Sequence, residues 1–143
     1  GCSSEKPAVN DDGNAASGAG LDKAVVFKSQ SCGCCSNYLS YMKKQRGFDV
    51  STVNLEDMSS VKDKYGIPLS MQTCHTMIVG NYFVEGHVPV EAVRKLLAEK
   101  PDIKGIAIPG MPAASPGMPG SKTGPFEVYA VSNDGKTSPF MTI

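Results

Sequence analysis

The sequence predicts an α/β protein in which a small mixed sheet carries flanking helices. Three observations lead to this fold class. Short apolar runs of strand character alternate with segments of helical period, glycine and proline separate these segments, and two alternating runs close the chain. With 143 residues, the chain has room for one domain with an ordinary hydrophobic core.

The first half of the predicted fold alternates strands with helices. Residues 24–28 form a short apolar strand, and the helix that follows begins at Ser31 or Cys32, either of which can cap it. Residues 48–55 alternate as a second strand, and residues 58–65 form a short helix that a glycine and a proline close.

The second half is predicted to begin with a strand pair. Residues 75–79 and 81–85 are two strands joined tightly at a glycine, which indicates a hairpin. Residues 90–100 form an amphipathic helix between two prolines. Residues 126–131 and 137–141 alternate like a hairpin around an Asn-Asp-Gly turn.

This order of elements is that of a thioredoxin-like domain, which we assign to residues 21–143. Two segments depart from the pattern: the C-terminal hairpin and a Gly/Pro/Met-rich loop predicted over residues 105–124. The loop contains the sequence PGMP twice, at residues 109–112 and 116–119.

Composition argues against two classes of partner. The 14 Lys and Arg residues balance 14 Asp and Glu residues, so the basic footprint of a nucleic-acid-binding protein is missing. No apolar run approaches the roughly 20 residues of a transmembrane helix. We therefore expect neither nucleic acid as a partner nor a membrane span.

The first 20 residues have a different composition from the rest of the chain. They are mostly small and polar and show no periodicity, so we expect residues 1–20 to be a flexible tether. Cys2 resembles the lipid-bearing cysteine of a mature bacterial lipoprotein, which would anchor the domain in the cell envelope, on the periplasmic side, through lipid alone. The alternative is a chance thiol in a disordered tail.

Three of the five cysteines lie within four positions, as Cys32, Cys34 and Cys35. The amino end of a helix favours thiolate over thiol, and Cys32 and Cys35 have the C-x-x-C spacing of thioredoxin-like redox pairs. A dithiol mechanism has no use for Cys34, which would offer unwanted disulfide partners. A third thiolate does, however, add a soft ligand to a metal site.

A second group of candidate ligands follows at Cys74, His75 and His87. Thioredoxin-like folds place a cis-proline loop beside the C-x-x-C pair, and here Cys74-His75 occupies the corresponding stretch. A thiol and an imidazole suit metal ligation better than peptide docking. His87 is expected at the next loop on the same edge.

The softness of these donors selects the metal. Several thiolates with imidazole suit Cu(I) or Zn(II), and methionine thioether favours copper. The two PGMP turns expose Met111 and Met118, although a methionine on such a turn is more often a gap-filler than a ligand. The predicted metal ligands are Cys32, Cys34, Cys35, Cys74, His75, His87, Met111 and Met118.

Four separated motifs resemble the CopG-type copper-resistance family, an envelope group long catalogued as a domain of unknown function. The motifs are SCGCC at 31–35, CHT at 74–76, EGHVP at 85–89, and PGMP with SPGM at 109–112 and 115–118. The resemblance covers the chain from residue 24 onward. It implies a thioredoxin-like fold, copper binding by the cysteine cluster, a role in copper tolerance, redox cycling of copper, and other envelope copper-handling proteins as partners.

Several interpretations of the cluster stay open at this point. A structural disulfide could join Cys32 to Cys35, or either of them to Cys74. The functional alternatives are a thiol-disulfide oxidoreductase with Cys32 as nucleophile and Cys35 as resolving thiol, and a zinc-stabilised interaction module. We favour a protein that sequesters Cu(I) over a copper oxidoreductase. More than one ion is expected, because four cysteines and two histidines exceed the needs of one tetrahedral or trigonal ion.

Overall fold

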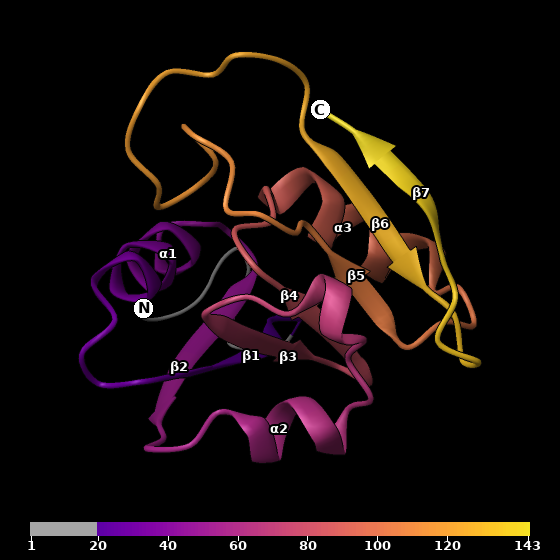
Figure 1. Cartoon of the computed structure of the whole chain (residues 1–143), viewed down its shortest axis with the longest axis horizontal. Coiled ribbons are helices and arrows are strands. Elements are labelled where there is room, and N and C mark those ends of the chain that lie inside the picture. Colours follow the sequence, from indigo (N-terminus) through magenta and orange to yellow (C-terminus); the bar gives the residue numbers. More distant parts are fainter. Residues whose placement is uncertain (1–19) are drawn as a thin grey trace.

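The computed structural model describes residues 20–143, which form seven strands, three α-helices and one 3-10 turn (Figure 1). The elements in chain order are β1 (Asp22–Lys28), α1 (Gly33–Lys43), β2 (Phe48–Asn54), α2 (Ser59–Lys64), the 3-10 turn η1 (Leu69–Met71), β3 (His75–Val79), β4 (Tyr82–Glu85), α3 (Val90–Glu99), β5 (Gly105–Ala107), β6 (Glu127–Val131) and β7 (Thr137–Thr142). The predicted tether and Cys2 lie outside the described residues, apart from Gly20. Among residues 20–143, no helix combines the length and the apolar character that crossing a membrane requires.

All seven strands belong to one mixed sheet with the order β2-β1-β3-β4-β5-β6-β7. β1 pairs in parallel with β2 and antiparallel with β3, and β4 pairs in parallel with β5. The predicted α/β class, with helices flanking a mixed sheet, is confirmed. β6 and β7 form the predicted C-terminal hairpin and extend the sheet at one end.

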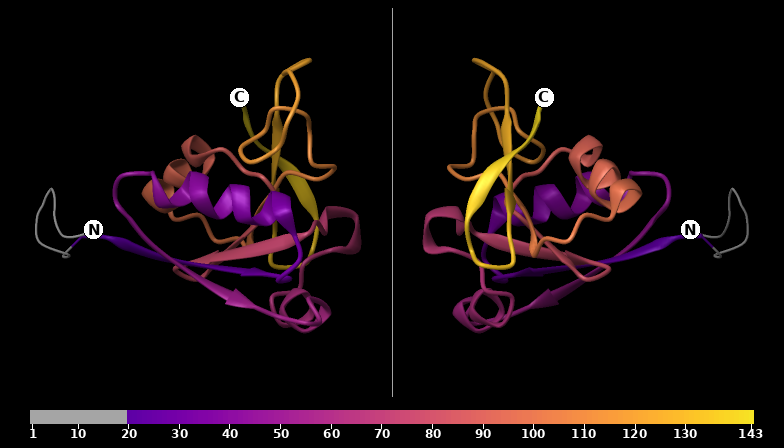
Figure 2. Two further views of the ribbon diagram at one scale, coloured as in Figure 1. Left: turned by 90° about the vertical axis from the view of Figure 1, so that its left-hand side faces the viewer. Right: turned by 90° about the vertical axis from the view of Figure 1, so that its right-hand side faces the viewer.

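The helices cover both faces of the sheet. α1 and α3 lie together on one face and α2 lies on the other (Figure 2). α1 turns Cys35, Tyr38 and Met42 inward at spacings of three and four residues, as an amphipathic helix does. α3 begins after Pro89 and ends at Glu99. Its C-cap residue, Lys100, takes a left-handed conformation with φ of 50° ahead of the next proline.

β5 was not predicted, because we expected an irregular loop from residue 105 onward. Three residues are too few to show alternation, and this strand is buried at every position between β4 and β6. The glycine that hid the strand from sequence reasoning is required there. A Cβ on Gly105 would collide with the backbone and ring of Phe83 on β4.

The topology brings the predicted site motifs to one edge of the sheet. Lys28 at the end of β1 pairs with His75 at the start of β3, and Thr76 pairs with Glu85 at the end of β4. Glu85 in turn pairs with Ala107 at the end of β5, from which the Gly/Pro/Met-rich loop departs. The cysteines of α1, both histidines and the loop therefore meet at this edge.

Candidate metal centre

The first part of the site is the amino end of α1. Cys32 is the N-cap residue, and its sulfur accepts a hydrogen bond from the backbone N–H of Cys35 at 3.3 Å. The structure joins Cys32 and Cys35 in a disulfide, with their Cα atoms 5.4 Å apart. Of the cysteines in residues 20–143, Cys34 and Cys74 are free thiols. One of the disulfide pairings left open by the sequence is thus present.

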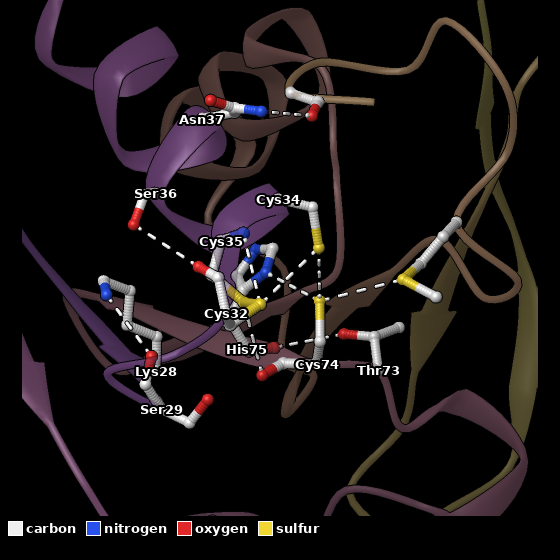
Figure 3. The surroundings of a disulfide bond; sticks show 12 residues. Lys28, Ser29, Cys32, Cys34, Cys35, Ser36, Asn37, Thr73, Cys74 and His75 are labelled. Carbon is white, nitrogen blue, oxygen red and sulfur yellow. Dashed lines mark hydrogen bonds between the residues drawn. A yellow bond between two sulfur atoms is a disulfide. The ribbon is translucent and has the colours of Figure 1, made fainter. Parts of the chain in front are cut away.

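Cys34 lies between the disulfide and the second group of ligands. Its sulfur is 3.5 Å from the sulfur of Cys32 and 3.5 Å from that of Cys74. Figure 3 shows Cys74 facing the three cysteines at the amino end of α1, which are Cys32, Cys34 and Cys35. The four sulfur atoms all lie within 4.8 Å of one another, close enough to share metal ions.

Cys74 also belongs to a second group of donors. Its sulfur lies 3.6 Å from Nδ1 of His75, 3.8 Å from Nε2 of His87 and 3.7 Å from Sδ of Met111. Cys74, His75 and His87 again place their ligand atoms within 4.8 Å of one another. The thiol of Cys74 is therefore common to both groups.

Backbone carbonyls orient the two imidazoles toward Cys74. Nε2 of His75 donates to the carbonyl of Gly86 at 3.0 Å, which leaves Nδ1 as the lone-pair nitrogen on the cysteine side. Nδ1 of His87 donates to the carbonyl of Pro116 at 2.6 Å, which leaves Nε2 facing the same sulfur. A histidine that ligates a metal almost always donates its other ring N–H in this way.

Tyr38 on α1 packs against both histidines. Its ring stacks on His75 with centroids 4.7 Å apart and meets His87 edge-on at 5.6 Å. Its hydroxyl donates to the carbonyl of Val88 at 2.7 Å, and burial raises the pKa of this phenol well above its usual value. The side chain of Tyr38 is thus uncharged and packs between α1 and the two imidazoles.

Burial governs the protonation of the donors. It lowers the pKa of His75 to about 3, with a further contribution from His87, and it lowers the pKa of His87 as well. Burial, followed by the hydrogen bond to Cys34, raises the pKa of Cys74 to about 12. At neutral pH both imidazoles are in the form that binds metal, whereas Cys74 has to lose a proton to a metal ion.

The two PGMP turns have different roles. The first brings Met111, 39% exposed and with φ of 44°, to Cys74. The second brings the Pro116 carbonyl to His87 and packs Gly117 against α1, where Asn37 donates to the Gly117 carbonyl at 3.4 Å. No hydrogen bond within residues 20–143 joins the sulfur of Met118 to the cluster, whereas the other seven predicted ligands lie together.

Sequence reasoning missed two buried charged residues beside the ligands, Lys62 on α2 and Glu85 on β4. Lys62 belongs to a short polar helix and looks like any solvated residue. Glu85 did carry a signal, because it ends an apolar strand and directly precedes Gly86-His87.

Comparisons with known proteins found one matching family model and similar solved structures. A family model described as "Protein of unknown function, DUF411" matches residues 71–118, the span from just before Cys74 to Met118. A solved structure titled "Copper resistance protein copG- Form 2" is similar with a TM-score of 0.78 and 36% sequence identity, over 86% of this chain and 98% of that one.

The chain belongs to the CopG family of copper-resistance proteins. A second CopG structure, titled Form 1, matches with a TM-score of 0.76 and 37% identity over 85% of this chain and 96% of that one. No curated protein sequence matches. The resemblance read from four short motifs is confirmed, and the Cys/His groups of this CopG-family chain are compatible with metal binding.

Proposed function

We propose that this protein serves copper resistance by holding Cu(I), as more than one ion, in the cluster of cysteines, histidines and Met111. The observation that carries the proposal is the position of the Cys74 sulfur, within 4 Å of a thiol, two imidazoles and a thioether. Soft sulfur donors mixed with imidazole suit Cu(I), and the thioether favours copper over zinc.

The proposal of several ions rests on the shared position of Cys74. It is a member of the four-cysteine group and of the Cys/His group, and a thiolate can bridge two metal ions. Four thiolates, two imidazoles and one thioether also exceed what one tetrahedral or trigonal ion takes up. Cys34, between the two groups, would be the second bridging candidate.

Loading the full cluster requires reduction of the Cys32–Cys35 disulfide. A dithiol reductant would supply two electrons and two protons, becoming a disulfide while Cys32 and Cys35 become thiols. Cu(I) then displaces thiol protons, and the histidines bind without losing one. The same mixed donor set accepts both copper oxidation states, which supports Cu(I)/Cu(II) cycling as part of the proposal.

Anaerobic Cu(I) titration of the reduced protein with elemental analysis tests the proposal. Every protein should carry Cys2→Ser, so that the thiol count refers to the cluster. We expect more than one equivalent of copper, and fewer equivalents in Cys34→Ser. Uptake of at most one equivalent would remove the multinuclear site, and a preference for zinc at matched free metal concentrations would favour the zinc-stabilised module.

Redox cycling has a separate test. Dithionite and oxygen should interconvert two spectroscopically distinct copper forms of the loaded protein. A loaded protein whose spectrum stays unchanged under both reagents would leave storage as the function.

A thiol-disulfide oxidoreductase is the second candidate, favoured by the disulfide at the amino end of α1. Cys34, 3.5 Å from Cys32, would compete for the exchange. A variant with Cys34→Ser, Cys74→Ser and His75→Ala cannot hold the proposed copper cluster. Disulfide reductase activity retained in that variant would favour this second function.

The proposed location is the periplasmic side of the bacterial envelope, with lipid on Cys2 and residues 1–20 as a tether. The composition of the N-terminal segment supports this location, and other envelope copper-handling proteins are the proposed partners. Mass spectrometry of protein exported behind a bacterial lipoprotein signal peptide should find an acylated Cys2, and Cys2→Ser should release the domain from membranes.

A further inference from the structure

A buried ion pair between Lys62 and Glu85 lies next to the residues that flank Cys74 and His75. Neither residue of the pair is a proposed copper ligand. Lys62 is 6% exposed and Glu85 is fully buried, and Nζ of the lysine lies 2.5 Å from Oε2 of the glutamate. A buried ion pair is often no more stabilising than apolar residues of the same volume. Its presence here therefore calls for a reason other than stability.

The contacts of Glu85 converge on the chain that carries Cys74 and His75. Oε2 accepts from the backbone N–H of Thr73 at 2.6 Å and lies 2.9 Å from the Thr73 hydroxyl. Oε1 accepts from the Thr76 hydroxyl at 2.6 Å. One carboxylate thus holds the residue before the ligand pair and the residue after it.

Lys62 completes this arrangement from α2, on the opposite face of the sheet from α1. Its ammonium group donates to the Glu85 carboxylate and, at 2.9 Å, to the Thr76 hydroxyl. The carboxylate is therefore neutralised and hydrogen-bonded on both oxygens, as a buried charge must be. Within this network the orientation of Glu85 is fixed.

The chain that follows Glu85 carries the other imidazole. The Gly86 carbonyl accepts from Nε2 of His75, and His87 comes next. Gly86 has φ of 90°, and a Cβ there would lie 2.6 Å from the carbonyl oxygen of Ile108, so the backbone has little freedom at this point. Glu85 is thus connected to Cys74 and His75 by hydrogen bonds to the residues that flank them, and to His87 by the backbone through Gly86.

We propose that Glu85, held by Lys62, is a positioning residue that fixes Cys74, His75 and His87 in ligand geometry before copper binds. The inference rests on the proposed function, because the geometry it explains is that of the copper ligands. Residues that orient metal ligands typically change metal affinity 10- to 100-fold when they are lost. A merely structural ion pair would change stability and leave affinity alone.

Three variants separate positioning from stability. Glu85→Gln keeps the shape and removes the charge, and the double variant Glu85→Met, Lys62→Met replaces the pair by apolar side chains. Glu99→Gln is the matched control, because it breaks the exposed Lys95–Glu99 pair on α3, whose polar atoms are 2.9 Å apart. Each protein is measured for Cu(I) affinity by chelator competition, for unfolding by urea, and, metal-free, for ring tautomers by ¹⁵N NMR.

We expect Glu85→Gln to bind Cu(I) about 10- to 100-fold more weakly, and Glu99→Gln to bind like the wild type. The double variant should regain stability relative to Glu85→Gln, since it leaves no unpaired buried charge, but should not regain affinity. In the metal-free wild type His75 should show one tautomer, protonated at Nε2. Both Glu85 variants should show a mixture.

Two results would overturn the inference: affinity of Glu85→Gln within about threefold of the wild type, or affinity that recovers together with stability in the double variant. If Glu85→Gln does not fold, the double variant is compared directly with the wild type under the same criteria. A wild type without any Cu(I) binding would instead refute the proposed function. The tautomers of the metal-free proteins would still decide whether Glu85 positions His75.

Discussion

Acid should destabilise the metal-free protein through His75, a fully buried imidazole. Its pKa in the folded protein is about 3, below the ordinary value of 6.5, so between these two values the unfolded chain binds more protons than the folded one. The stability that follows from the neutral ring is therefore complete above pH 6.5 and is lost as the pH falls toward 3. Between pH 7 and pH 4 the loss due to this one ring amounts to about 3 kcal/mol.

Urea unfolding at a series of pH values measures this loss, with His75→Phe as the comparison. Phenylalanine keeps a ring against Tyr38, which stacks on His75 at 4.7 Å, and removes the titration. The free energy of unfolding of the variant should fall by about 3 kcal/mol less than that of the wild type between pH 7 and pH 4. His87 is present in both proteins, so the difference between the two profiles reports His75 together with its coupling to His87. Parallel pH profiles for the two proteins would refute the reasoning.

Three further predictions concern the thioether, the shared thiol and the second PGMP turn. Met111→Leu should weaken Cu(I) binding about tenfold in chelator competition, whereas Met118→Leu should leave it unchanged; equal effects would contradict the placement of Met111. Because the pKa of Cys74 is about 12, Cu(I) loading of the reduced protein at pH 7 should release about one proton more than loading of Cys74→Ser, as read with a pH indicator. Gly117→Ala and Gly135→Ala both place a side chain at φ of 87°, but of the two only a Cβ on Gly117 would have neighbouring atoms within 4 Å. Gly117→Ala should therefore lower the free energy of unfolding in urea by about 1 kcal/mol more than Gly135→Ala does, and it alone should weaken copper binding.

Sequence reasoning located the start of α1 because the signal there was local. Cys32 was one of the two predicted caps and is the N-cap of α1, and its spacing to Cys35 placed both sulfurs on the first turn of that helix. The order of strands and helices then implied that Cys74-His75 would lie opposite this turn.

The parts that could not be predicted depend on contacts between distant segments. The two PGMP copies are the same in sequence, yet one presents Met111 to Cys74 and the other presents a carbonyl to His87. Their difference arises from what each turn packs against, and Gly117 packs against the backbone of Tyr38 on α1. Lys62 likewise reads as a surface residue, because its partner Glu85 lies 23 positions away in the sequence.

These observations divide the site into two halves with different readiness for metal. The imidazole half is already in binding form, since both rings are oriented by carbonyls and their pKa values lie below neutrality. The thiol half is not, because two sulfurs are joined in the disulfide and Cys74 holds its proton firmly. Reduction of the disulfide and deprotonation of the thiols therefore separate this state from one in which all four sulfurs can bind a metal ion. Loading of the proposed copper site therefore depends on a supply of reducing equivalents for the Cys32–Cys35 disulfide.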